Sequence, residues 1–254
     1  FLSQLFDRCG FQFNDPIPGY GTRPFMADND AVLEGLAAAR RAFKKAEKNV
    51  PDDSGLDTAI VVDYRERFYF DAHSATRPGY ALYDLAPIYL YRSGTDFDVL
   101  SVDDYLATKK RYAKVVAFNL FHTPEEKAVA LRKKLAADRS RAVQIVVPGY
   151  PAADLGKDCE RLDTIPVTGE AWAKVFRTLG THLYTAPGNC FRRNGDLLMF
   201  CTGEAGRYSI TLPEADRGKS WVELLGDANG RPVKGPVLEF ESDGPRTWFF
   251  MSKR

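Results

Sequence analysis

The sequence predicts an α/β fold: a flavodoxin-like, doubly wound parallel sheet with an N-terminal helical arm and a small C-terminal antiparallel β domain. Up to about residue 180, short apolar runs typical of buried strands alternate with segments of helical spacing. Strands and helices joined this closely form parallel βαβ units. Beyond residue 180, strand-like runs follow one another with tight turns between them, which favours hairpins. We therefore expect three parts, at residues 1–56, 57–180 and 181–254.

The α/β part contains four apolar runs that we predict as strands, at residues 58–63, 97–100, 114–118 and 143–147. An unusually aromatic helix is expected at 78–91 and another helix over about 168–179. The helix after residue 118 has the clearest start, because Thr123 can cap it, Pro124 suits the first helical position and Glu126 completes a capping box.

The two ends of the chain have different patterns. Residues 1–28 are aperiodic, rich in Gly and Pro, and contain five phenylalanines, which indicates an arm packed on another surface. A helix capped by Asp28 or Asp30 should follow, and residues 51–55 have the composition of a linker. In the C-terminal part, Asn194-Gly195 and Asn229-Gly230 predict tight hairpin turns.

Composition restricts the classes of partner. Among the 254 residues, 35 basic and 34 acidic side chains leave a formal net charge of +1, which argues against nucleic acid and anionic membranes as partners. The sequence has no apolar run of the roughly 18 residues needed to span a bilayer, so we expect a soluble protein. A chain that begins with Phe1 indicates a fragment or a processed protein, and its compartment stays open.

Cysteine and histidine are sparse and widely spaced. The four cysteines, Cys9, Cys159, Cys190 and Cys201, show no CxxC spacing, and the three histidines show no i,i+4 pair. We therefore expect neither a metal site nor a cofactor. Cys190 and Cys201 fall in successive predicted strands, where they either meet across a hairpin or remain buried free thiols.

Polar residues gather after two of the predicted strands. In an open parallel sheet the carboxyl ends of the strands meet at one edge, and ligands bind there. The candidate ligand-binding residues at this edge are Asp63, Tyr64, Arg65, His73, Asn119 and His122. The alternative is structural, with Asp63 and Asn119 capping turns and the two histidines held by hydrogen bonds or lying on the surface.

Three stretches together resemble a known family. The runs DFDVLSVDDYL, KVVAFNLFHTPEEKAVALRKKL and AVQIVVPGY resemble the β-galactosidase trimerisation domain, a relative of the class I glutamine amidotransferase fold. The tail, from GTHLYTAPGNCFRRNGDLLMF to WVELLGDANG, resembles the small β domain that ends such glycoside hydrolases. The resemblance covers about residues 57–254 and implies an upstream catalytic barrel or another subunit as partner. One departure is Asp138-Arg139-Ser140, where the relatives usually carry glycines.

The sequence lacks the residues for two kinds of catalysis on this fold. An amidotransferase needs a Gly-x-Cys-x-Gly elbow after a strand, whereas residues 119–122 stand at that position. In the resembled glycosidases, the two carboxylates lie in a (β/α)8 barrel of about 250 residues, and only 57 residues precede Thr58. We therefore expect no catalytic residues in this chain.

The leading hypothesis is a non-catalytic accessory and oligomerisation region of a β-galactosidase-like glycoside hydrolase. One alternative is a carbohydrate- or small-molecule-binding module that uses the carboxyl edge of the sheet. Another is a divergent glycosidase in which the same edge supplies acid and base. Four tyrosines on one predicted helix indicate a contact with another domain or subunit, because tyrosine is enriched at such contacts: Tyr80, Tyr83, Tyr89 and Tyr91.

Overall fold

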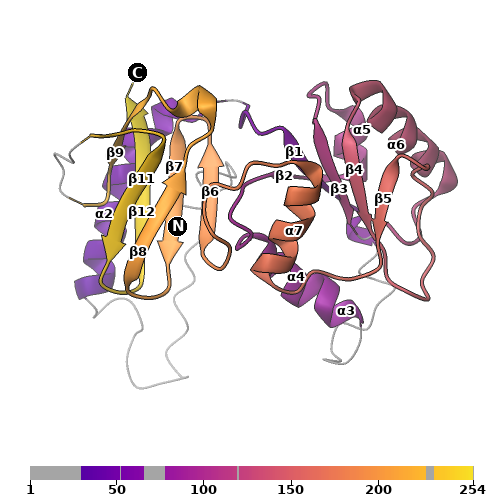
Figure 1. Cartoon of the computed structure of the whole chain (residues 1–254), viewed down its shortest axis with the longest axis horizontal. Helices are drawn as coiled ribbons and strands as arrows, with labels where there is room; N and C mark the ends of the chain where they lie inside the picture. The colour runs from indigo at the N-terminus through magenta and orange to yellow at the C-terminus, as the bar shows by residue number, and fades with distance from the viewer. Residues whose placement is uncertain (1–29, 52, 66–77, 119, 227–231, 254) are drawn as a thin grey trace.

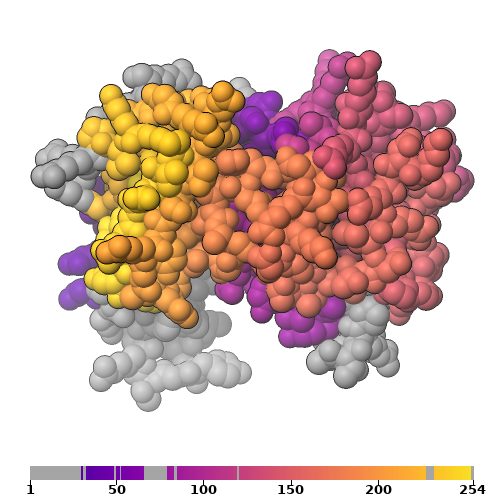
Figure 2. Space-filling model, in the orientation of Figure 1, coloured from indigo at the N-terminus to yellow at the C-terminus, as the bar shows by residue number. Residues whose placement is uncertain are grey.

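The computed structural model describes residues 30–51, 53–65, 78–118, 120–226 and 232–253. In Figure 1 the α/β domain lies beside a β domain made of the C-terminal strands, and Figure 2 shows their surfaces in continuous contact on this face. The predicted arm, Cys9, His73, Asn119 and the turn at Asn229-Gly230 lie outside the described residues.

The α/β domain contains a parallel sheet with strand order β2-β1-β3-β4-β5, the flavodoxin-like order that the sequence predicts. Its strands are β1 (Thr58–Val62), β2 (Asp98–Ser101), β3 (Lys114–Phe118), β4 (Arg141–Ile145) and β5 (Cys159–Leu162). All five residues of β1 are buried, as expected for a strand covered on both faces. The sequence does not predict β5, because its short stretch CERL carries two charged residues and no apolar run.

Helices cover both faces of this sheet. One face is covered by α7 (Gly169–Leu179) and by a continuous helix made of α3 (Pro78–Tyr80), the π-helical turn η3 (Ala81–Leu85) and α4 (Ala86–Leu90). The other face is covered by α5 (Val102–Ala107) and α6 (Glu125–Asp138). In α7, the Thr168 side chain caps the helix by accepting a hydrogen bond from the backbone N–H of Ala171.

The two ends of α6 differ from the prediction. Thr123 does not cap the helix; Pro124 is the N-cap, in an extended conformation, and its carbonyl accepts the N–H groups of Lys127 and Ala128. The predicted capping box is therefore absent, and that prediction is wrong. At the other end Arg139 has a φ of 56°, the left-handed conformation that favours glycine. This is the stretch where the resembled family usually carries glycines.

The β domain is antiparallel, as expected. One sheet has the order β10-β9-β12-β7-β6, and a second contains β8 and β11. Their bounds are β6 (Cys190–Asn194), β7 (Leu197–Thr202), β8 (Gly206–Thr211), β9 (Ser220–Glu223), β10 (Val233–Lys234), β11 (Val237–Ser242) and β12 (Arg246–Lys253), with a 3-10 turn η4 (Glu214–Asp216). Between the sheets lies an aromatic core that includes Phe191, Phe200 and Trp221.

The N-terminal helix α2 (Asp30–Ala46), which leads into the short turn η1 (Glu47–Asn49), packs on the β domain. Its Ala42 and Ala46 meet Leu197, Met199 and Phe249 on the face of the larger sheet that points away from the smaller one. Figure 1 shows α2, in indigo, alongside these C-terminal strands. The first described helix and the last strands of the chain therefore share one apolar core.

The two domains meet at the segment between α4 and β2. Main-chain bonds make much of the contact: the Gly94 carbonyl accepts the N–H groups of Tyr184 and Thr185, and the Arg92 carbonyl accepts that of Gly188. The Thr95 hydroxyl donates to the carbonyl of His182 at 2.8 Å. These bonds explain why the segment is buried although it is a loop.

A buried ion pair completes the junction. The Asp96 carboxylate lies 3.1 Å from the Arg192 guanidinium of β6 and also accepts the backbone N–H groups of Arg193 and Phe97. The Arg192 guanidinium lies over the Tyr91 ring, 5.0 Å from its centroid. Burial raises the pKa of Asp96 to about 6, and the charge of Arg192 opposes that rise. The Arg193 side chain in turn pairs with buried Asp216 at 2.8 Å.

The first prediction concerns Gly94. Its φ is +86°, and a Cβ at this position would lie 2.2 Å from the Thr185 carbonyl oxygen. We expect Gly94→Ala to lower the free energy of unfolding by roughly 2–5 kcal/mol, measured by urea unfolding and tryptophan fluorescence. Gly218→Ala is the control, since a Cβ there meets nothing within 4 Å. Equal stability of the two variants would contradict the role of Gly94.

The second prediction concerns Arg192. Arg192→Met leaves the Asp96 carboxylate buried without its cation, which should lower the free energy of unfolding by roughly 3–5 kcal/mol at neutral pH. Because the folded-state pKa of Asp96 is raised from 3.8 to about 6, its contribution to stability falls as pH rises through that window. Without Arg192 the pKa of Asp96 should rise further, because the burial of its carboxylate is no longer opposed by a cation. The variant should therefore lose less unfolding free energy near pH 5, where Asp96 is protonated, than near pH 8.

The measurement is urea unfolding of both proteins in the two buffers. Arg207→Met is the matched control, because the Arg207 side chain is 89% exposed and lies 3.8 Å from Glu241, itself 75% exposed. An exposed ion pair of this kind contributes little to the free energy of unfolding. A loss of stability at Arg192 that is no larger than at Arg207, or that grows as the pH falls, would contradict the prediction.

Candidate functional site

Asp63 lies at the carboxyl end of β1, with its side chain nearly fully buried. Its carboxylate accepts two hydrogen bonds from the Arg65 guanidinium, at 2.9 and 2.5 Å, and a third from the Arg65 backbone N–H at 3.1 Å. These bonds hold the pKa of Asp63 below its ordinary value, mainly through the side-chain bond with Arg65. The carboxylate therefore stays ionised and caps the turn after β1, which is unfavourable for a general acid.

A cavity of about 230 Å³ opens beside this turn. It lies between the ends of β1 and β3 and the helix formed by α3, η3 and α4, and its wall is mainly apolar, with Ile60, Val62, Leu82 and Phe118. Asp63 and Tyr64 also line it. Tyr64 is 63% exposed, and partial burial together with the charge of Asp104 raises the pKa of its phenol.

The structure brings together some of the predicted site residues. Asp63 and Tyr64 line the cavity, and Arg65 is bound to Asp63. His122 is exposed after β3 and is not among the residues of the cavity wall. His73 and Asn119 lie outside the described residues, so their part in a site stays a prediction.

The cavity wall also includes four residues that the sequence did not mark as site residues: Pro87, Leu90, Tyr91 and Val99. The aromatic and apolar character of residues 78–91 was the available signal, since a helix covering one face of a sheet needs fewer such residues. Part of that signal has another cause, because Tyr91 also packs against Phe97 and under the Arg192 guanidinium.

The described part of the α/β domain offers no activated cysteine. Cys159 stands at the amino-terminal end of β5, is buried, and has its pKa raised to about 11 by burial. A nucleophilic cysteine needs the opposite, a lowered pKa and exposure at the carboxyl edge. Among the described residues there is no group of three or more His, Cys, Asp or Glu side chains placed to hold a metal ion. None of the described helices is long and apolar enough to cross a membrane.

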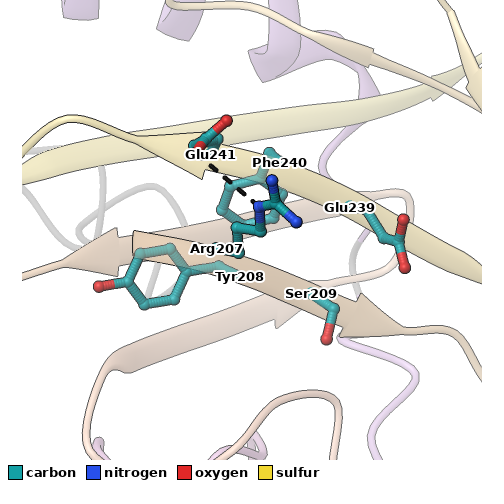
Figure 3. A pocket seen from close by; sticks show the side chains of 6 residues that line it. All are labelled: Arg207, Tyr208, Ser209, Glu239, Phe240 and Glu241. Atoms are coloured by element: carbon teal, nitrogen blue, oxygen red, sulfur yellow. Dashed lines mark ion pairs between the residues drawn. The ribbon is translucent and has the colours of Figure 1, made fainter. Parts of the chain in front are cut away.

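A second hollow, of about 490 Å³, lies on the smaller sheet of the β domain. Figure 3 shows Arg207 of β8 pointing toward Glu241 of β11, with Ser209 and Glu239 farther along the same two strands. The Arg207–Glu241 pair is exposed, and the aromatic pair Tyr208 and Phe240 packs toward Phe200 of the larger sheet. This hollow has the character of a solvated strand face.

Comparison with known proteins supports the fold. No protein-family model and no curated protein matches the sequence. The structure is similar to a β-galactosidase from the psychrophilic Marinomonas ef1, with a TM-score of 0.54 and 10% identity over 89% of this chain and 43% of that one. A match to an apo exo-carrageenase GH42 from Bacteroides ovatus has a TM-score of 0.45 and 11% identity, over 88% and 32% of the two chains.

The chain thus spans less than half the length of either protein. At 10% identity the likeness to the β-galactosidase establishes a shared fold, an α/β domain with a separate antiparallel β domain. The resemblance to β-galactosidase-like proteins is confirmed at this level. Its assignment to the trimerisation domain, and the relation to amidotransferases, stay predictions.

Proposed function

We propose that this chain is a non-catalytic accessory and assembly region of a glycoside-hydrolase-like protein. The observation that carries the proposal is the structural similarity to the β-galactosidase. The similar region covers 89% of this chain and so extends over both of its domains. It covers only 43% of the β-galactosidase chain. A region of that kind binds a partner, which is the upstream catalytic barrel or another subunit.

The chemistry of the carboxyl edge supports a non-catalytic role. Glycoside hydrolysis needs two carboxylic groups, one of them a proton donor with a raised pKa. The pKa of Asp63 is lowered instead, and its oxygens are engaged by Arg65. The buried thiol of Cys159 does not replace it, because its pKa is raised and it lies at the other end of the strands.

Exposed apolar side chains of the α/β domain give the assembly role a surface. Tyr64, Ile88 and Val99 are 63%, 54% and 39% exposed, and Tyr64 and Val99 also line the cavity beside the turn after β1. Val99 lies in β2, the edge strand of the parallel sheet, whose outer side pairs with no other strand among the described residues. Apolar side chains beside an open sheet edge favour contact with another protein surface.

A specific observation favours a second candidate, a binding module for a carbohydrate or another small molecule. The cavity combines an apolar wall with an exposed tyrosine and a carboxylate at the carboxyl edge of a parallel sheet. An aromatic ring can stack on the apolar face of a sugar ring while polar groups bind its hydroxyls. Its volume of about 230 Å³ suits one small ring rather than an oligosaccharide.

The third prediction concerns assembly. We expect the chain to self-associate in sedimentation velocity runs over a hundredfold range of concentration, and the double variant Ile88→Glu, Val99→Glu to shift it toward monomer, because buried carboxylates would oppose the contact. Leu33→Glu is the matched control, since Leu33 is 45% exposed on α2 of the other domain. A wild-type chain that stays monomeric throughout would contradict assembly with another subunit.

The fourth prediction concerns catalysis. We expect no hydrolysis of nitrophenyl glycosides above the buffer rate, even at high protein concentration, because no described carboxyl group at the edge is poised to donate a proton. Turnover that disappears in Asp63→Asn would overturn this expectation. Titration of the same panel by calorimetry separates the candidates, because saturable binding that is lost in Tyr64→Ala would favour the binding module.

A further inference from the structure

Cys190 and Cys201 stand opposite each other in neighbouring antiparallel strands. Cys190 opens β6, Cys201 lies near the end of β7, and the two are register partners. The adjacent pair, Phe191 and Phe200, points into the core between the two sheets, so both cysteine side chains lie on the face that carries α2. Cα atoms of opposed residues in such a pair lie about 4.5–5.5 Å apart, within the range that a disulfide spans.

The two sulfurs already interact as thiols. The Thr247 hydroxyl of β12 lies 3.6 Å from the Cys201 sulfur. The neighbouring Cys190 thiol is the main cause that lowers the pKa of Cys201, to about 6, and Cys201 is the main cause that raises the pKa of Cys190. Cys201 is therefore the nucleophilic member of the pair and Cys190 the proton-bearing one.

Reagents can reach the pair. Both cysteines are half-buried free thiols and line an open cavity of about 500 Å³ together with Arg92, Asn189 and Glu204. Cys159, by contrast, is buried, and its pKa is raised to about 11. The chain thus contains its own unreactive reference thiol.

We propose that Cys190 and Cys201 form a redox modification site, at which hydrogen peroxide converts the two thiols into a reversible cross-strand disulfide. The Cys201 thiolate attacks one peroxide oxygen, the O–O bond breaks, and hydroxide leaves and takes up a proton to become water. The Cys190 sulfur then loses its proton and attacks the sulfenic sulfur of Cys201, whose S–O bond breaks to release a second water. The two sulfurs supply the two electrons that reduce the peroxide.

This disulfide would lie close to the domain junction. β6 carries Arg192 and Arg193, two and three residues after Cys190, and these residues hold Asp96 and Asp216. A covalent link between β6 and β7 restrains the strand that bears both arginines. The thermal midpoint of the oxidised chain should therefore exceed that of the reduced chain by several degrees.

The fifth prediction tests the site by mass spectrometry. The reduced chain is treated with dilute hydrogen peroxide, quenched with an alkylating agent and digested. We expect a peptide pair linked through Cys190 and Cys201, a mass loss of about 2 Da that dithiothreitol reverses, and a rate at least tenfold above that of Cys159 modification. Cys190→Ser should leave a Cys201 sulfenic acid that a 1,3-dione traps, and Cys201→Ser should leave Cys190 unreactive.

Thr247→Val provides a second readout that does not remove either cysteine. Loss of the hydroxyl should raise the pKa of Cys201 and slow disulfide formation several-fold at neutral pH. The proposal is overturned if Cys190 and Cys201 react no faster than Cys159. It is also overturned if oxidation gives only links between chains or sulfonic acids without an internal disulfide.

Discussion

The arrangement of this protein depends on one buried interaction, the carboxylate of Asp96 held by Arg192 and by two backbone N–H groups. Asp96 stands just before β2 in the α/β domain, and Arg192 belongs to β6 in the β domain. Neither group can change partner cheaply, because a buried charge without its counterpart costs several kcal/mol. The pair therefore restrains the position of one domain on the other, together with the main-chain bonds of Gly94 and Arg92.

The same interaction connects the junction with the proposed assembly surface. Tyr91 lies under the Arg192 guanidinium, packs on Phe97 and lines the cavity beside the turn after β1. The aromatic helix over residues 78–91 thus has two roles: one end supports the domain junction, and its outer side exposes Ile88. Contacts with both domains restrain this helix, and a surface restrained before binding loses less conformational entropy when a partner binds.

The sequence predicted the features that depend on neighbouring residues. Apolar runs marked four of the five parallel strands, Thr168 marked the start of α7, and Asn194-Gly195 marked the β6–β7 turn. It missed contacts between residues far apart in the chain, because no local pattern indicates that Asp96 meets Arg192 or that α2 packs on β7 and β12. For the candidate site, the carboxyl edge follows from strand direction, whereas the engagement of Asp63 by Arg65 requires side-chain geometry.

The kind of contacts at the domain junction also limits which substitutions the sequence can accept. Apart from Asp96 and Arg192, its contacts include main-chain carbonyls of Tyr91, Arg92 and Gly94, and these bonds do not depend on side-chain identity. Steric limits concentrate at glycines, because a Cβ at Gly94 or Gly169 would meet backbone atoms at 2.2 or 2.5 Å. A two-domain arrangement fixed by few side chains tolerates extensive substitution elsewhere. The fold shared with a β-galactosidase over 89% of the chain at 10% identity agrees with such tolerance.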